Sequence, residues 1–418
     1  MNRPHTLLPP LLLALAASPA LAQAPQQKVS PPEAQAWIDL ATYSGFGMPG
    51  MGGGEGGPGT MAMLGGMFGR ATGLNTNRFG NTRSGLAGQW MDVNVYSRKG
   101  ALTEATLAVP PGSGLAPVLN LKPPKAAAPA PARTSRDDDI EPVEHERPKG
   151  KVSLYWGCGD TVRPGQPRTV DFATAMPQDL MQIFNGRRAT QRGTHSAAGE
   201  PLWPNETDGR VVPKGATLAG EMAFAGNGLP DNWRFNLPAQ QDLMPPLELQ
   251  QADTGAATQL SWAALPTARA FFAAAMGARK GEDGHIVLWV SSELPDSGFG
   301  LVDYQTNAAV DRWLKDKVLL PAGTTSCSIP KEVFGGEGAM LRVIAYGSEL
   351  NLAHPPRPTD PRVAWEPQWA VKVRLKSVAT TMLGMDAGGR KPDNKQENKP
   401  EGDKKPSKLD ILRGILGR

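Results

Sequence analysis

Beyond its first residues, the chain contains no apolar run of the ~18 residues that a membrane-spanning helix needs. The one apolar stretch near the start, residues 7–17, follows the positive Arg3 and precedes a small-x-small site at residues 20–22. This layout is typical of a bacterial secretory signal peptide. We therefore expect residues 1–22 to be removed and the mature protein, beginning at Gln23, to be soluble and either periplasmic or secreted.

Cysteine is scarce, with only Cys158 and Cys327 in 418 residues. An exported chain meets an oxidising compartment, where two thiols that can reach each other usually pair. We predict a disulfide between them; the alternative is a pair of buried free cysteines. No cysteine lies in or just after the signal segment, which argues against lipid attachment at a mature N-terminal cysteine.

Catalytic and cofactor motifs are also lacking. The sequence has no G-x-S-x-G, no H-E-x-x-H, no phosphate-binding loop and no G-x-G-x-x-G. Cys158 could act as a nucleophile with His195 as its base, but nothing in the sequence places the two side by side. We therefore assign no catalytic residue and no cofactor, and favour a protein that is not an enzyme.

A basic surface for nucleic acid is missing, although the pI is near 9.0. Residues 390–418 carry nine Lys or Arg against five Asp or Glu, a surplus equal to the +4 net charge of the whole chain. The rest of the chain is thus close to neutral. Nucleic-acid binding would need basic and aromatic side chains clustered on a folded surface, so we exclude it.

Glycine and proline are abundant, at 48 and 40 residues, and this favours short strands and loops over helices. We predict a mainly β protein with two sandwich-like domains. A flexible Gly/Met-rich segment, with a short helix around residues 33–42, covers residues 23–88. The first β domain covers residues 89–242 and carries a Pro/Ala-rich and charged insertion at 122–151, and the second covers residues 243–378.

Within residues 89–242, alternation predicts strands at WMDVNVYS, EATLAVP, KVSLYW, TLAGEMAFAG and WRFNLP, the first two as a strand pair around a Lys99-Gly100 turn. Gly157 and Gly159 flank Cys158 where KVSLYW ends, and we expect them to let the chain turn sharply. The YWGCGD segment followed by VRPGQP resembles an uncharacterised family of exported proteobacterial proteins. That resemblance implies a localisation but no activity.

The second β region opens with a strand through Trp262, a corner at Pro266 and a strand through Phe271 and Phe272. Trp262, Leu265-Pro266, Ala268 and Phe271 resemble the second and third strands of fibronectin type III and related immunoglobulin-like sandwiches. The resemblance covers residues 243–377 and implies a sandwich in which the tryptophan packs in the core. TNAAVDRWLKDK departs from that pattern because it predicts a helix capped by Thr306 or Asn307.

Two segments have the composition of metal sites. Met48, Met51, Met61, Met63 and Met67 offer thioether sulfur, a ligand for Cu(I), although low-complexity glycine with methionine as filler explains them as well. Residues 137–146 gather carboxylates and a histidine, but their spacing matches no calcium loop and is typical of a solvated charge run. We assign no metal site, and copper binding stays the weakest of three functional alternatives.

The last residues, 379–418, form a basic tail that we predict to be disordered up to a short amphipathic helix. Ser407 and Asp410 have the spacing of a helix cap, and four apolar side chains share one face: Leu409, Leu412, Ile415 and Leu416. A helix this short needs a surface to dock on, such as an envelope protein or an anionic membrane. A solvated tail end is the alternative.

These observations favour an exported, non-catalytic binding or scaffolding protein of the cell envelope or the secreted fraction. A periplasmic hydrolase or carbohydrate-active enzyme without a recognisable motif is the alternative. A cleft with two carboxylates of perturbed pKa would favour the enzyme. The sequence leaves the ligand and the oligomeric state open.

Overall fold

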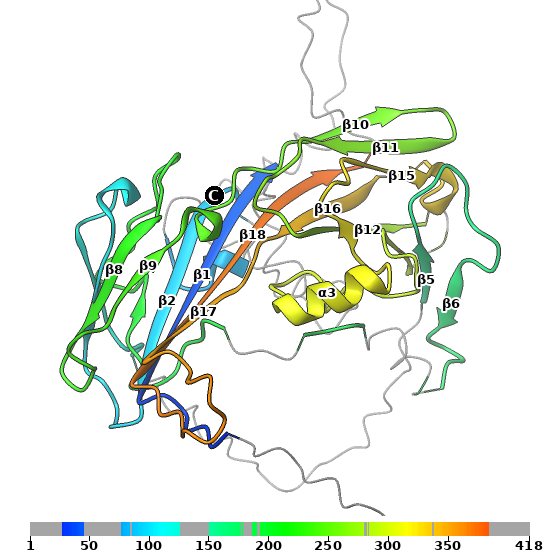
Figure 1. Cartoon of the computed structure of the whole chain (residues 1–418). Helices are drawn as coiled ribbons and strands as arrows, with labels where there is room; N and C mark the ends of the chain where they lie inside the picture. Colours follow the sequence, from blue (N-terminus) through cyan, green and yellow to red (C-terminus); the bar gives the residue numbers. More distant parts are fainter. Residues whose placement is uncertain are drawn as a thin grey trace, which may run out of the picture. The chain divides into compact units, whose positions relative to one another are not determined.

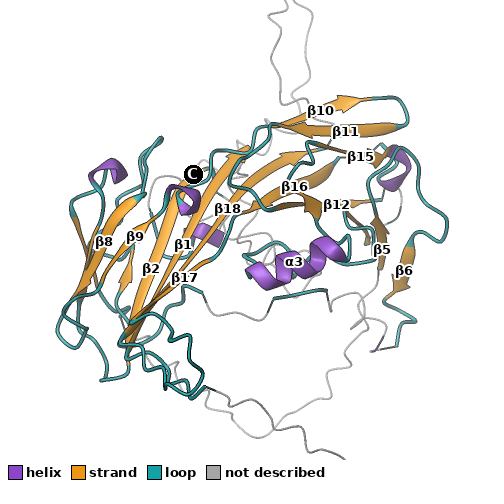
Figure 2. Ribbon diagram, in the orientation of Figure 1, coloured by secondary structure: helices purple, strands orange, loops and turns teal. Residues whose placement is uncertain are grey.

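The computed structural model describes residues 27–45, 77–83, 86–125, 150–176, 178, 186–189, 193–279, 282, 284–336 and 338–383. The predicted mainly-β class is confirmed, since strands dominate these residues and a single α-helix accompanies them (Figure 1; Figure 2). Three sheets hold the strands. No helix in this described part has the length and apolar character of a membrane span.

The largest sheet has eleven strands and runs in the order β6-β5-β13-β12-β16-β18-β1-β2-β7, with β14 paired to β12 and β17 to β18. Its centre is a long parallel pair in which Ala34 lies opposite Trp369 and Gly45 opposite Thr380. The bounds are β1 Ala34–Gly45, β2 Gly88–Ser97, β5 Lys151–Trp156, β6 Arg168–Asp171, β7 Leu202–Trp203, β12 Ala270–Ala278, β13 His285–Val290, β14 Leu320–Pro321, β16 Ala339–Tyr346, β17 Leu350–His354 and β18 Trp369–Met382.

Two smaller sheets share a hydrophobic core with one face of the large sheet. This core contains Ile38 of β1, Leu107 and Phe224 of the four-stranded sheet, and Leu260 and Ile329 of the three-stranded sheet. The four-stranded sheet consists of β4 Val118–Leu121, β3 Ala105–Ala108, β8 Gly220–Ala225 and β9 Arg234–Leu237, and the three-stranded sheet of β10 Leu249–Asp253, β11 Ala257–Trp262 and β15 Ser326–Pro330. The described residues also contain four short 3₁₀ helices: η1 Asn81–Arg83, η2 Pro111–Ser113, η3 Ala239–Gln241 and η4 Lys331–Val333.

The helix predicted at TNAAVDRWLKDK is present as α3, Asn307–Lys315, and the Thr306 side chain caps it by accepting a hydrogen bond from the Ala309 N–H at 3.2 Å. Val310 and Trp313 are buried and contribute to a second core on the opposite face of the large sheet, with Tyr43 of β1 and Tyr346 of β16. Because successive strand residues point to opposite faces, β1 supplies Ile38 to one core and Tyr43 to the other.

The helix expected around residues 33–42 is wrong, because these residues belong to the strand β1. β1 pairs with β2 along one edge and with β18 along the other, and its two faces pack into the two cores, so nearly every residue is buried. Two neighbours from distant parts of the sequence provide backbone partners and apolar contacts along its length. These contacts outweigh the helical preference of its alanines.

The predicted division at residue 242 is not followed by the sheets. The large sheet takes β2, β5, β6 and β7 from residues 89–242 and β12, β13, β16 and β18 from the later part. The expected pairing of WMDVNVYS with EATLAVP is also wrong, since β2 pairs with β1 and β7 whereas β3 pairs with β4 and β8. Residues 379–382, which were expected to belong to the tail, form the end of β18 instead.

Candidate functional site

The predicted disulfide is confirmed: Cys158 and Cys327 are bonded, with Cα atoms 5.2 Å apart. Cys158 follows β5 of the large sheet and Cys327 lies in β15, so the bond joins two sheets. Gly157 has φ +94°, and a Cβ there would lie 2.6 Å from the Arg163 guanidinium, which explains the glycine at this sharp turn.

The hypothesis of a Cys158 nucleophile with His195 as base is wrong. The sulfur is in the disulfide and carries no thiol. The His195 ring instead contacts the Gly193 carbonyl oxygen through Nδ1 at 2.7 Å and the Glu200 carboxylate through Nε2 at 2.9 Å. Both residues therefore have structural partners of their own.

Several predicted segments lie outside the described residues: the five methionines of residues 48–67, the acidic run 137–146, and the tail face of Leu409, Leu412, Ile415 and Leu416. Those hypotheses stay predictions. Among the residues that the structure does describe, no group of three or more His, Cys, Asp or Glu side chains is arranged to hold a metal ion.

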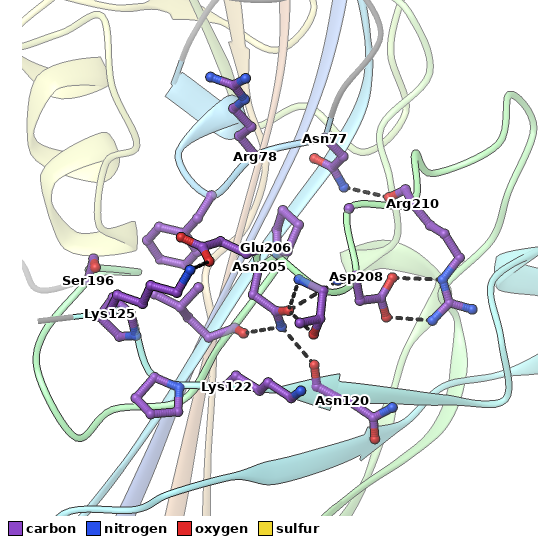
Figure 3. Close-up of a pocket in the computed structure, with 17 residues that line it drawn as sticks. Asn77, Arg78, Asn120, Lys122, Lys125, Ser196, Asn205, Glu206, Asp208 and Arg210 are labelled. Carbon is purple, nitrogen blue, oxygen red and sulfur yellow. Dashed lines mark hydrogen bonds and ion pairs between the residues drawn. The ribbon is translucent and has the colours of Figure 1, made fainter.

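A pocket of about 1270 Å³ is the candidate site (Figure 3). Three segments far apart in the sequence line it together with Ser196: residues 77–79 before η1, Asn120 and residues 122–125 at the end of β4, and Leu202 with residues 204–210 after β7. The β4 and β7 segments are held together because Lys122 and Leu202 exchange backbone hydrogen bonds of 3.2 and 3.0 Å. Ligand pockets usually measure about 300–1,000 Å³, so this one has room for a small molecule.

The Asn205 side chain fixes the turn that forms one wall. Its Nδ2 donates to the carbonyl oxygens of Asn120 and Leu202 at 2.8 and 3.0 Å, and its Oδ1 accepts from the backbone N–H groups of Thr207 and Asp208, both at 3.1 Å. An asparagine suits this position because its side chain can bond the backbone two and three residues ahead. Asn205 therefore has a positioning role.

The two carboxylates of the pocket are both paired with cations. Arg210 donates to Asp208 from Nε at 2.7 Å and from Nη2 at 2.5 Å, a bidentate geometry, and this hydrogen bonding lowers the pKa of Asp208 below its ordinary value of 3.8. Lys125 forms an ion pair with Glu206, and both side chains are exposed. A general acid needs a raised pKa to hold its proton near neutral pH, so Asp208 does not meet that requirement.

Three polar side chains in the pocket lack part of their usual partners. Asn77 is 2% exposed, and its Nδ2 donates to the Arg210 carbonyl oxygen at 2.7 Å, while its Oδ1 accepts no hydrogen bond within the described residues. Arg78 and Lys122 are exposed and form no ion pair in that same part of the chain. The lining of the pocket thus contains two exposed positive charges and one buried acceptor without a partner among the residues described.

A second constellation has the distances of a catalytic triad. The Ser153 Oγ lies 2.8 Å from His285 Nε2, and His285 Nδ1 lies 2.9 Å from the Glu282 carboxylate. However, Ser153 is 2% exposed, sits in the middle of β5 with paired strands on both sides, and also bonds the Thr169 hydroxyl at 2.8 Å. A nucleophile must reach a substrate beside oxyanion donors, so this cluster fits a buried hydrogen-bond network better than an active site.

No protein family, curated protein or solved structure matches the chain. The pocket itself was not predicted from the sequence. The run Asn205-Glu206-Thr207-Asp208-Gly209 has the composition of a tight turn, and this was the one feature that could have pointed to it.

Proposed function

We propose that the protein is an exported, non-catalytic binding protein of the cell envelope or the secreted fraction, and that it binds a small polar ligand in the pocket of Figure 3. The observation that carries this proposal is the pairing of both pocket carboxylates with cations, while Asn77 Oδ1, Arg78 and Lys122 lack partners within the described residues. Such a site offers recognition groups without a general acid.

Export is supported by two features of different kinds. The disulfide between Cys158 and Cys327 is typical of proteins that fold outside the reducing cytoplasm. The layout of residues 1–22 is that of a cleavable secretory signal. N-terminal sequencing of the protein from fractionated cells is expected to give Gln23 in the periplasmic or secreted fraction. An intact Met1 in the cytoplasm would reject this part of the proposal.

Ligand binding is tested by a thermal-shift screen with sugars, amino acids, short peptides and nucleotides. The Ser196→Trp variant fills the pocket with a bulky side chain and is expected to abolish any shift that the wild type shows. Thr103→Trp replaces another exposed hydroxyl residue, one that does not line the pocket, and serves as the matched control. A ligand that still stabilises Ser196→Trp as it does the wild type binds elsewhere, and the proposed site is then wrong.

A further inference from the structure

The charges that line the pocket do not balance. Four cations face two carboxylates, and Lys125 and Arg210 neutralise Glu206 and Asp208. Arg78 and Lys122 remain without an acidic partner in the described part of the chain, and Figure 3 shows them on opposite sides of the 205–208 turn in that view. The excess of positive charge favours a ligand with acidic groups.

The Asn77 amide adds a requirement for a hydrogen-bond donor. Its orientation is fixed, because Nδ2 donates to the Arg210 carbonyl oxygen and the flipped amide would place two acceptor oxygens together. Oδ1 is therefore an acceptor, and it is buried without a partner among the described residues. A buried acceptor without a donor is unfavourable, and a ligand hydroxyl would satisfy it.

The same pocket has nonpolar surfaces. Phe79, Pro123, Pro124 and Pro204 line it and present flat apolar faces beside the charged groups. Aromatic and proline rings suit the C–H face of a sugar ring, whose rim carries the hydroxyls that polar side chains recognise.

We propose that the pocket binds an acidic saccharide, a sugar that carries a carboxylate or a phosphate. Arg78 and Lys122 contact the acidic groups, Asn77 Oδ1 accepts from a ring hydroxyl, and the rings of Phe79 and the prolines pack against the sugar. This inference rests on the proposed binding function and names its ligand class.

Calorimetric titration of the full mature protein tests the class with four probes. Trigalacturonate and galactotriose share their sugar stereochemistry and differ in the carboxylates; galactose 6-phosphate supplies the phosphate arm, and AMP is an anion of another class. We expect trigalacturonate or galactose 6-phosphate to bind and galactotriose and AMP to bind at least about tenfold more weakly, with affinity falling as salt is raised.

Two charge variants assign the contacts. Arg78→Gln and Lys122→Gln are each expected to weaken binding of the acidic sugar about three- to tenfold, in the range of single partly exposed ion pairs. Lys315→Gln removes an exposed cation from α3 and is expected to leave affinity unchanged. Both pocket positions are exposed, so the variants are expected to fold like the wild type.

The outcomes separate the two proposals. If galactotriose or AMP binds as tightly as the acidic sugars and Ser196→Trp abolishes that binding, the acidic-saccharide inference is overturned while the proposed pocket function stands. If acidic sugars bind but neither pocket variant weakens them, the inference is overturned as well. If none of the four probes binds, the inference fails, and the wider thermal-shift screen decides the binding function by itself.

Discussion

The molecule contains two clusters of arginine, lysine and aspartate. Each is built around a bidentate arginine–aspartate ion pair, and the two differ in how far the arginine is exposed to solvent. On the α3 face of the large sheet, Asp39 is fully buried and Arg374 is 3% exposed on its side chain, and the two form a bidentate pair with Nε 2.6 Å from Oδ1. In the pocket, the Arg210–Asp208 pair has similar geometry, and the Asp208 side chain is also buried at 8% exposed, but the Arg210 side chain is 44% exposed. The exposure of the arginine is what distinguishes the two pairs.

The charged groups around the Asp39–Arg374 pair all have partners. Lys376 pairs with Asp303 at 3.3 Å and lies 4.2 Å from the Tyr304 ring centroid, and Arg374 lies 4.4 Å from the same ring. Thr194 adds a backbone hydrogen bond of 3.2 Å to Asp39. A charge removed from water requires such partners, whereas Arg78 and Lys122 of the pocket are exposed to water and available to a ligand.

The largest expected effect separates the two pairs by the same substitution. Arg374→Leu removes the bidentate partner of the buried Asp39 and leaves it only the longer contact with Arg83 at 3.5 Å, so it is expected to lower the free energy of unfolding by about 3–5 kcal/mol. Arg210→Leu removes a cation that is 44% exposed, and water can take its place beside Asp208, so it is expected to cost less, about 1–2 kcal/mol. Urea denaturation followed by circular dichroism measures both. Equal losses in the two variants would contradict the comparison.

A double variant controls for lost packing around Arg374. Asp39→Asn removes the charge that Arg374→Leu leaves behind, so the pair of changes is expected to cost less than the sum of the two single changes. If the loss in the double variant equals the sum of the losses in the two single variants, the cost comes from packing alone and the ion pair contributes nothing measurable.

The second prediction concerns Asp92, which lies opposite Asp39 in the β1–β2 pair. Burial raises the pKa of Asp92 to about 7, against hydrogen bonds from Thr82 and Gly80 that act to lower it. The unfolded value is near 3.8, so between about pH 4 and 7 the folded state holds a proton that the unfolded state has lost. Stability from this group is therefore complete below pH 4, declines towards pH 7 and is constant above it.

The measurement is the free energy of unfolding of the wild type and Asp92→Asn from pH 4 to pH 8. The wild type is expected to lose at most about 1.4 kcal/mol per pH unit relative to the variant across this range, the limit for one proton. A difference that does not vary with pH would mean that Asp92 has the same pKa in both states.

The third prediction tests the close packing over the Arg374 guanidinium. A Cβ at Gly193 would lie 1.7 Å from Arg374 Nη2, so Gly193→Ala forces the guanidinium away from Asp39. We expect a loss of about 1–3 kcal/mol, as for other overpacked sites. Gly323→Ala, where nothing lies within 4 Å of the added Cβ, is the matched control and is expected to change stability by about 0.5 kcal/mol or less. A similar loss in both variants would indicate a general cost of alanine at loop glycines.

The strands and the helix were predictable because their evidence is local. Alternating apolar residues identified β2, β5 and β8, and Thr306 identified the start of α3. β1 was missed because its strand conformation depends on β2 and on β18, which begins more than 300 residues away. The Lys99-Gly100 turn between β2 and β3 suggested that the two strands pair, but they belong to different sheets, which the local sequence does not reveal.

The disulfide was predictable because only one pairing exists for two cysteines, but the pocket was not. Its walls come from residues 77–79, 120–125 and 202–210, and no single segment contains enough of the site to suggest it. The unpartnered Asn77 Oδ1 depends on the orientation that the Arg210 carbonyl imposes, which is a property of the folded chain.

The smallest expected effect concerns a third polar cluster, in which Ser153 and His285 are buried and the Glu282 side chain is 48% exposed. If its groups satisfy each other as those around Asp39 do, a fluorophosphonate probe is expected to leave Ser153 unmodified in the folded protein, since the side chain is 2% exposed. Ser153→Ala is expected to cost about 1 kcal/mol, the worth of a hydrogen bond in a network whose other members, including Thr169, remain. Mass spectrometry of the probe-treated wild type, with Ser153→Ala as the control for labelling elsewhere, gives the answer. Stoichiometric modification that disappears in Ser153→Ala would show a reactive serine, and the alternative of a hydrolase would then replace that of a binding protein.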